Sequence, residues 1–327
     1  MLERLGFFTY LGGHAEPGRL LSETAELLVA AEELGLDSVW VAQHHFGSEV
    51  GNLPSPLPFL ASVGARTRRI HLGTAVVVLP LEQPLRLAED AAVVDLLSGG
   101  RLELGLGSGI GSEDLAAFGR DPGQRRSLTR DGLRTLLAGV GGERLANGRT
   151  LYPVAPGLRQ RVWQGVFSPE RTREAAAMGT HVLLPKASPN IPGMEAEQQA
   201  RAARAFQEAW SHPWPGRVGL SRPVYPSTDR RSARRELAEG IRHLVDQANA
   251  RAGARVTEEE YLESGAFHLG SVEEVVEGLA ADPALGCATE LICQFGHIAP
   301  AMNHALRALE LLATEVGPAL GWRPNRD

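Results

Sequence analysis

Two histidines stand side by side where an apolar run ends. His44 and His45 follow the segment 39–42 (VWVA), which predicts a short buried strand. In a barrel of parallel strands, residues at the carboxyl end of a strand face the active site, and an imidazole there can hold or move a proton near neutral pH. Side chains alternate along a strand, so only one of the two can point inward. The pair can equally be ordinary polar residues of a loop, and these residues alone leave both readings open.

A candidate anion site lies at 168–172, where the sequence Ser-Pro-Glu-Arg-Thr opens a predicted helix. Ser168 suits the N-cap and Pro169 the first turn, so free backbone N–H groups there can bind an anion. Arg171 and Thr172 offer further donors to a phosphate. Taken alone, the segment favours a simple capping motif over a binding site.

Two further segments are rich in small residues. The turn 105–111 reads GLGSGIG, which differs from the G-x-G-x-x-G dinucleotide fingerprint and has no Walker lysine. Its glycines let the backbone approach a ligand closely, although a flexible loop is the alternative. The segment 73–80 (GTAVVVLP) has small side chains in a buried strand, which leaves room for a flat ligand. Ordinary barrel packing explains that segment as well.

Alternating strands and helices must position these residues. The predicted strands are 5–10, 38–42, 70–79, 101–107, 161–167, 181–184, 217–224 and 290–295, and the predicted helices are 20–35, 56–67, 84–97, 169–179, 194–210, 230–252 and 299–316. Ser271 with Glu274 predicts a capping box before the last strand. Eight βα units in 327 residues predict an α/β fold, the (β/α)8 TIM barrel. A doubly wound sheet is the alternative.

The chain is predicted to form a single barrel domain over residues 1–327, with two excursions. Residues 139–157 are glycine-rich and predict a loop with a short extra hairpin. Residues 253–268 predict a linker-like segment before the last unit. Long loops at the carboxyl face of a barrel often act as lids.

Composition excludes several classes of function. The net charge of −6 and pI of about 6.0 give no electrostatic reason to expect nucleic acid or an anionic membrane. Two cysteines, at 287 and 293, supply neither a disulfide framework nor a zinc site, and a reduced cytoplasmic chain is the simplest fit. The first residues do not form a signal peptide, and the longest apolar stretch, 72–81, is too short for a membrane span. No H-E-x-x-H and no carboxylate triad is present, so no metal is expected.

Taken in order, these segments resemble the luciferase-like flavin-dependent monooxygenase family. The resemblance is strongest over residues 36–120 and weak over 185–260. The segments that carry it are 7–10 (FFTY), 40–46 (WVAQHHF), 72–80 (LGTAVVVLP), 83–90 (QPLRLAED), 94–102 (VDLLSGGRL), 104–107 (LGLG), 163–168 (WQGVFS), 267–270 (FHLG) and 294–296 (QFG).

The resemblance implies a barrel that binds reduced FMN (FMNH2) at the carboxyl ends of its strands. With O2 the flavin would form a 4a-peroxyflavin that oxygenates a small organic substrate, and a separate flavin reductase would supply FMNH2. His44 matches the catalytic histidine of the family. A non-proline cis bond would fall at Ala75–Val76. The cofactor-binding positions would be Ala75, Val76, Gly107, Ser108, Gln164, Ser168, Arg171 and Thr172.

The match has departures that bear on function. Gly107 stands where luciferase carries a reactive cysteine, and Ser108 stands where it has a phosphate-binding arginine. The mobile loop near the seventh strand is shortened. The resemblance therefore favours flavin oxygenation without light emission. Two alternatives stay open: a deazaflavin-dependent enzyme that transfers hydride, and a non-catalytic flavin-binding partner subunit.

A dimer is expected from the same resemblance. The predicted helices 56–66 and 84–97 match helices that pack against a second subunit, and small residues permit close helix contact. The residues concerned are Leu60, Ala61, Val63, Ala88, Ala91, Ala92 and Val93. They can also pack only on their own barrel. The partner would be an identical or a sister chain.

Overall fold

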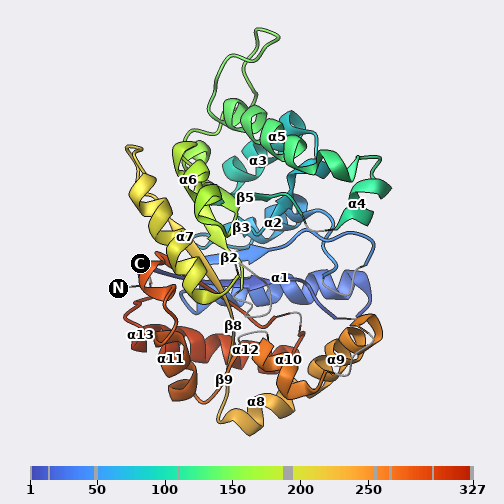
Figure 1. Cartoon of the computed structure of the whole chain (residues 1–327), viewed down its shortest axis with the longest axis vertical. Coiled ribbons are helices and arrows are strands. Elements are labelled where there is room, and N and C mark those ends of the chain that lie inside the picture. The colour runs from blue at the N-terminus through green and yellow to red at the C-terminus, as the bar shows by residue number, and fades with distance from the viewer. Residues whose placement is uncertain are drawn as a thin grey trace.

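The chain folds as a closed barrel of parallel strands with helices around it (Figure 1). It is described from a computed structural model. The described residues are 2–13, 15–47, 51–109, 111–186, 194–252, 256–264, 267–296 and 298–324.

Parallel strands form the ring. They are β1 (Arg4–Thr9), β2 (Ser38–Val41), β3 (His71–Thr74), β5 (Leu102–Gly107), β6 (Val162–Gly165), β7 (His181–Leu184), β8 (Val218–Pro226) and β10 (Glu290–Gln294). Two short strands lie off the ring: β4 (Val77–Val78) pairs with β5, and β9 (His268–Gly270) pairs with β8. Because β10 pairs with both β8 and β1, the ring closes. The predicted TIM barrel is confirmed, and the doubly wound sheet is excluded.

Helices form the outer layer (Figure 1). They are α1 (Pro17–Glu33), α2 (Pro56–Gly64), α3 (Pro84–Leu97), α4 (Ser112–Ala117), α5 (Arg125–Val140), α6 (Pro169–Ala177), α7 (Ala196–Ala209), α8 (Arg230–Glu236), α9 (Ala238–Ala252), α10 (Glu258–Ser264), α11 (Val272–Ala280), α12 (Met302–Leu311) and α13 (Gly317–Ala319). The predicted capping box opens α11: Ser271 Oγ accepts from Glu274 N at 3.3 Å, and Ser271 N donates to Glu274 Oε2 at 2.8 Å. Within the described residues, no helix combines the length and apolar character that a bilayer crossing needs.

Three predicted elements are divided in the structure. The strand expected over 70–79 becomes β3 and β4, separated by a cis bond at Ala75–Val76. The helix expected over 230–252 breaks at Leu237, the C-cap of α8. The helix expected over 299–316 is α-helical to Leu311 and then makes a π-helical turn at Leu312–Val316. Periodicity locates such segments well but does not reveal breaks within them.

The sequence patterns assign no helix to α4 and α5, which the structure shows between β5 and β6. The buried residues of α5 include Leu133, Leu136, Leu137 and Val140. Their spacing is helical, but glycines and arginines between them dilute the apolar signal.

The two predicted excursions have different outcomes. Residues 141–157 make turns, one of them closed by a hydrogen bond from Leu145 N to Arg149 O at 2.7 Å. This fully described stretch contains no strand, so the predicted hairpin is wrong. Most of its residues are exposed, and Pro153 and Pro156 cannot donate to a strand ladder, so little stabilises a hairpin there. Of residues 253–268, positions 253–255 and 265–266 lie outside the described residues, and the remainder includes α10.

Two tryptophans fill the barrel. Trp40 and Trp163 meet edge to face, with ring centroids 5.3 Å apart at 88°. Gly73 makes room for Trp40, since a Cβ there would lie 2.1 Å from its ring. Phe8, Ala42, Leu183 and Ile292 complete this interior cluster, and Tyr10, Ala75 and Val76 pack against it. The register shows which side of each strand faces inward, because paired residues share a side.

Buried ion pairs close the amino end of the barrel. Arg217 donates to Glu103 and to Glu290, each at 2.8 Å, and its guanidinium lies 4.5 Å from the centroid of the Trp163 ring. The cation of Arg217 and hydrogen bonding by His71 hold the pKa of Glu103 well below its usual range despite burial. Charges paired this closely are costly to separate, so this end is structural and a ligand would enter at the carboxyl end.

Candidate active site

His44 lies just beyond the carboxyl end of β2, on the inward side. Trp40 and Ala42 belong to the interior cluster, and two-residue alternation carries that side on to His44. The His44 backbone N donates to Leu53 O at 2.9 Å. Its ring lies 6.0 Å from that of Tyr10. Gly51 packs against both residues: a Cβ there would lie 2.7 Å from His44 Cδ2 and 2.5 Å from Tyr10 O.

The electrostatic surroundings of His44 favour a neutral imidazole. Burial lowers its pKa from the usual 6.5; Asp114 of α4 acts in the opposite direction, and His45 lowers it further. A neutral imidazole at neutral pH can accept a proton from a ligand or hold one for it.

The neighbours of His44 in sequence brace the site from outside. His45 packs edge-on against Phe118, with ring centroids 4.7 Å apart, so the two imidazoles diverge as alternation requires. Gln43 accepts from Val78 N at 2.6 Å and donates to Glu82 at 2.9 Å. It therefore ties the end of β2 to β4.

The cis peptide bond lies at Ala75–Val76, where the family resemblance placed it. It adjoins the end of β2, because Ala75 N donates to Val41 O at 2.8 Å and Gln43 N to Val76 O at 3.3 Å. Val76 is seated over two glycines: a Cβ on Gly107 would lie 2.4 Å from its Cγ2, and one on Gly165 would lie 3.0 Å from its Cγ1.

The glycines of the turn after β5 are needed because neighbouring strands of the barrel leave no room for a Cβ. A Cβ on Gly105 would lie 1.9 Å from Thr74 O, and one on Gly109 would lie 2.7 Å from Val78 Cγ1. Gly107 meets Val76 in the same way. Ser108 between them is exposed, and its Oγ donates to Gly109 O at 3.4 Å. Among the described residues of this turn, Ser108 presents its side chain to solvent at the carboxyl face.

Of the three side chains predicted to bind phosphate at the start of α6, Ser168 and Arg171 are accessible to a ligand and Thr172 is not. Ser168 Oγ accepts from Arg171 N at 3.4 Å, and Arg171 is exposed in an ion pair with Glu174 at 2.8 Å. Thr172 is fully buried, and its hydroxyl donates to Ala202 O of α7 at 2.8 Å. Its hydroxyl joins two helices, so we remove Thr172 from the candidate phosphate ligands.

Gln164 also leaves the candidate set as a side chain. Its neighbours Trp163 and Gly165 face the interior, so alternation turns Gln164 outward. Its Nε2 donates to Thr180 Oγ1 at 2.6 Å, which ties β6 to the start of β7. Only its backbone remains near the barrel mouth.

Three polar residues that the sequence patterns missed also face the barrel interior, two of them at the carboxyl end and Ser221 in the middle of its strand. Gln294 ends β10, Ser221 lies in β8, and Tyr10 follows β1. Gln294 Nε2 donates to Ser221 Oγ at 2.5 Å. For Gln294 and Tyr10 the available signal was a polar residue at the end of an apolar strand, as for His44. Ser221 lies inside its strand, and it meets Gln294 only because β8 pairs with β10 when the ring closes.

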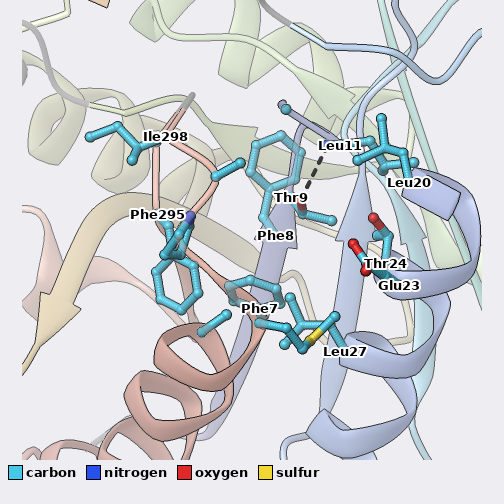
Figure 2. A pocket seen from close by; sticks show the side chains of 16 residues that line it. Phe7, Phe8, Thr9, Leu11, Leu20, Glu23, Thr24, Leu27, Phe295 and Ile298 are labelled. Atoms are coloured by element: carbon cyan, nitrogen blue, oxygen red, sulfur yellow. Dashed lines mark hydrogen bonds between the residues drawn. The ribbon is translucent and has the colours of Figure 1, made fainter. Parts of the chain in front are cut away.

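Two hollows lie outside the barrel mouth. One, of about 110 Å³, lies between β1, α1 and α12 and is lined by Phe7, Leu27 and Phe295 among others (Figure 2). The other, of about 520 Å³, lies between α1 and α2. Neither contains His44, Ala75 or Val76. Across the described residues, no group of three or more His, Cys, Asp or Glu side chains is placed to hold a metal ion.

Comparison with known proteins agrees with this geometry. The model of the family described as luciferase-like monooxygenase matches residues 5–291. The 4-hydroxyprotoasukamycin monooxygenase of Streptomyces nodosus subsp. asukaensis is 28% identical over 312 residues, covering 85% of this chain and 82% of that protein.

Solved structures share the fold at low identity. Monooxygenase RslO1 from Streptomyces bottropensis has a TM-score of 0.81 at 22% identity, covering 97% of this chain and 99% of that one. The oxygenating constituent of 3,6-diketocamphane monooxygenase from Pseudomonas putida, in complex with FMN, has a TM-score of 0.75 at 18% identity, covering 97% and 98%. An F420-dependent secondary alcohol dehydrogenase has a TM-score of 0.72 at 17% identity, covering 98% and 99%, so the fold alone does not select the flavin.

Proposed function

Because the chain belongs to the luciferase-like monooxygenase family and is a flavin-dependent monooxygenase, we propose that its flavin is FMN, used in the reduced form. FMNH2 from a separate flavin reductase and O2 would together oxygenate a small organic substrate. When bound, the reduced flavin supplies the electrons that activate oxygen. The proposal rests above all on one observation: His44 stands at the barrel mouth beside the Ala75–Val76 segment.

The residues of the mouth fit a flat ligand. Val76, held over Gly107 and Gly165, gives a small apolar surface next to His44. The interior cluster below it, which includes Phe8 and Trp40, forms an apolar floor. Such a floor excludes water, which protects reactive groups from hydrolysis and strengthens polar contacts above it.

His44 is the residue we assign to proton transfer. Its lowered pKa keeps the imidazole neutral near pH 7, so it can take a proton from the substrate as oxygen is transferred. Gln43 and Gly51 fix the loop that carries it.

The amino end of α6 is the phosphate site we propose. Ser168 and the backbone N–H groups of the first turn supply donors, and Arg171 supplies a cation. The Arg171–Glu174 pair is exposed and is worth at most about 1 kcal/mol, so Arg171 can exchange it for a phosphate. Ser108, exposed after β5, is a second polar contact in this proposal.

We propose a dimer, with an identical or a sister chain, through α3. Leu60, Val63, Ala88, Ala91 and Ala92 are buried within this chain, so they do not form the contact. Val93, Leu96 and Leu97 of α3 are 42%, 49% and 71% exposed, and they provide an apolar face in their place. We also propose that the chain is cytoplasmic, because its two cysteines, Cys287 and Cys293, are both free thiols.

Flavin binding tests this function. The full chain is titrated anaerobically with FMN, FMNH2 and reduced deazaflavin F420, and binding is followed by flavin absorbance and fluorescence. Tightest binding of FMNH2 supports the proposal. Preference for F420 together with hydride transfer to or from it would assign the chain to the hydride-transferring branch instead. Binding of FMN without oxygen consumption would identify a non-catalytic subunit.

A further inference from the structure

Four polar side chains on consecutive strands of the ring form an arc on the inward side of the barrel, from the middle of β8 to the mouth. In ring order the strands run β8, β10, β1 and β2, and they carry Ser221, Gln294, Tyr10 and His44. Ser221 pairs in register with Ile292 of the interior cluster, and Gln294 with Phe8 of the same cluster. Both therefore face inward, like His44.

The amide nitrogen of Gln294 is committed to its neighbours. Nε2 donates to Ser221 Oγ at 2.5 Å. A hydrogen bond from the Gln294 side chain also lowers the pKa of Tyr10, although burial outweighs it and the pKa is raised overall. The hydrogen bond from Nε2 to Ser221 Oγ sets which way the amide lies.

The amide oxygen of Gln294 lacks a hydrogen-bond donor within the described part of the chain. Gln294 is 1% exposed, and its Oε1 has no hydrogen-bond partner among the described residues. Buried acceptors without partners are rare because they lose their hydration and gain nothing in return. An O–H or N–H group of a ligand would recover that loss.

We propose that Gln294 is a specificity residue that accepts a hydrogen bond from a hydroxyl or N–H group of the substrate. The inference rests on the proposed function, and it narrows the substrate class to molecules that carry such a donor. Tyr10 lies between Gln294 and His44, with its ring 6.0 Å from that of His44. A donor group held at Gln294 therefore places the rest of a small substrate along the arc toward His44. Ser221 is a positioning residue, because it acts by orienting the amide.

Phenol and anisole test this, since they differ only in the methyl group that replaces the donor hydrogen. The full chain is labelled with 15N in the glutamine side chains, and the Gln294 resonance is identified by its loss in Gln294→Met. Phenol should shift that resonance and anisole should not. Gln199 is the matched control: it is fully buried with an unpartnered Oε1, but it belongs to α7 and donates to Pro185 O at 2.9 Å.

Affinities give the second readout. One hydrogen bond to a buried acceptor corresponds to roughly tenfold in the dissociation constant. The phenol-over-anisole preference should therefore be roughly ten times larger in the wild type than in Gln294→Met, and Ser221→Ala should reduce it in part. An equal preference in both proteins overturns the inference, as does a Gln294 resonance that phenol leaves in place up to its solubility limit.

The same samples are titrated with FMN, so the two proposals fail separately. If Gln294→Met binds FMN as the wild type does but keeps the preference for phenol over anisole, the inference about Gln294 is rejected and the proposed function is not. If the wild type binds phenol through Gln294 but binds no FMN, the proposed function is rejected and the role of Gln294 as a hydrogen-bond acceptor is kept.

Discussion

The contact between Gly107 and Val76 gives a prediction whose size follows from the structure. Gly107→Ala places a Cβ 2.4 Å from Val76 Cγ2, well inside van der Waals contact. Gly107 does not have a positive φ, so alanine meets no backbone penalty and the clash acts alone. Overpacking of this kind costs about 1–3 kcal/mol. The free energy of unfolding should fall by that amount.

A second substitution tests the cause. Val76→Ala removes both Cγ atoms, and alone it should cost about 1 kcal/mol as a partly buried truncation. In the double variant the clash with Cγ2 is gone and only a 3.3 Å approach to Val76 Cβ remains, so its loss should be smaller than the sum of the two single losses by at least about 1 kcal/mol. Gly286→Ala is the control, since a Cβ there meets nothing within 4 Å.

Urea unfolding of the four proteins and the wild type, followed by circular dichroism, gives the cycle. Additive losses in the double variant would refute the seating of Val76 over Gly107. So would a loss in Gly107→Ala no larger than that of Gly286→Ala. FMN titration of the same proteins then reports whether this seat is also the place where the flavin binds.

Three further predictions concern the site and the scaffold. His44→Ala should lower turnover by ~10² or more while FMN affinity stays within a few-fold, and the acid limb of the wild-type pH–rate profile should lie below the usual histidine pKa of about 6.5, because burial lowers the pKa of His44; wild-type turnover in the variant would leave His44 only a structural role. Ser168→Asp should weaken FMN binding roughly tenfold or more by placing a charge against the phosphate, whereas Thr172→Val, whose hydroxyl faces α7, should not; equal affinities in both variants would move the phosphate elsewhere. The folded pKa of His181 is lowered to about 4, chiefly by burial, so the unfolded chain binds more protons between about 6.5 and 4 and stability should fall as pH decreases through that window. Urea unfolding at several pH values should show this slope, with a shallower slope in His181→Phe; an unchanged slope would assign the acid sensitivity to other groups.

The barrel could be predicted because its elements are local. Apolar strands of four to six residues, helices begun by proline and the Ser271–Glu274 capping box all leave a signature within one segment. Alternation also predicted that only one of His44 and His45 could point inward, and the choice of His44 came from the family resemblance. The position of the cis bond came from family resemblance, since no local pattern in Ala75–Val76 marks one.

Other parts of the site depend on tertiary structure. Gln164 turns outward because Trp163 occupies the interior, and Thr172 is buried because α7 packs on α6. The local sequence around Gln164 or Thr172 predicts neither the orientation of the first nor the burial of the second. Ser221 and Gln294 are far apart in the chain and meet only because β8 pairs with β10 when the ring closes. The glycines of 105–109 looked like room for a ligand, but the nearest atoms belong to β3, β4 and Val76.

Rapid mixing of the anaerobic FMNH2 complex with oxygenated buffer tests the central claim most directly. A monooxygenase with an apolar floor beneath its mouth should show an absorbance transient that free FMNH2 does not give, consume oxygen, and emit little or no light with a long-chain aldehyde. His44→Ala should bind FMNH2 but lose product formation. Oxidation indistinguishable from that of free FMNH2, together with hydride exchange on a deazaflavin, would contradict the account.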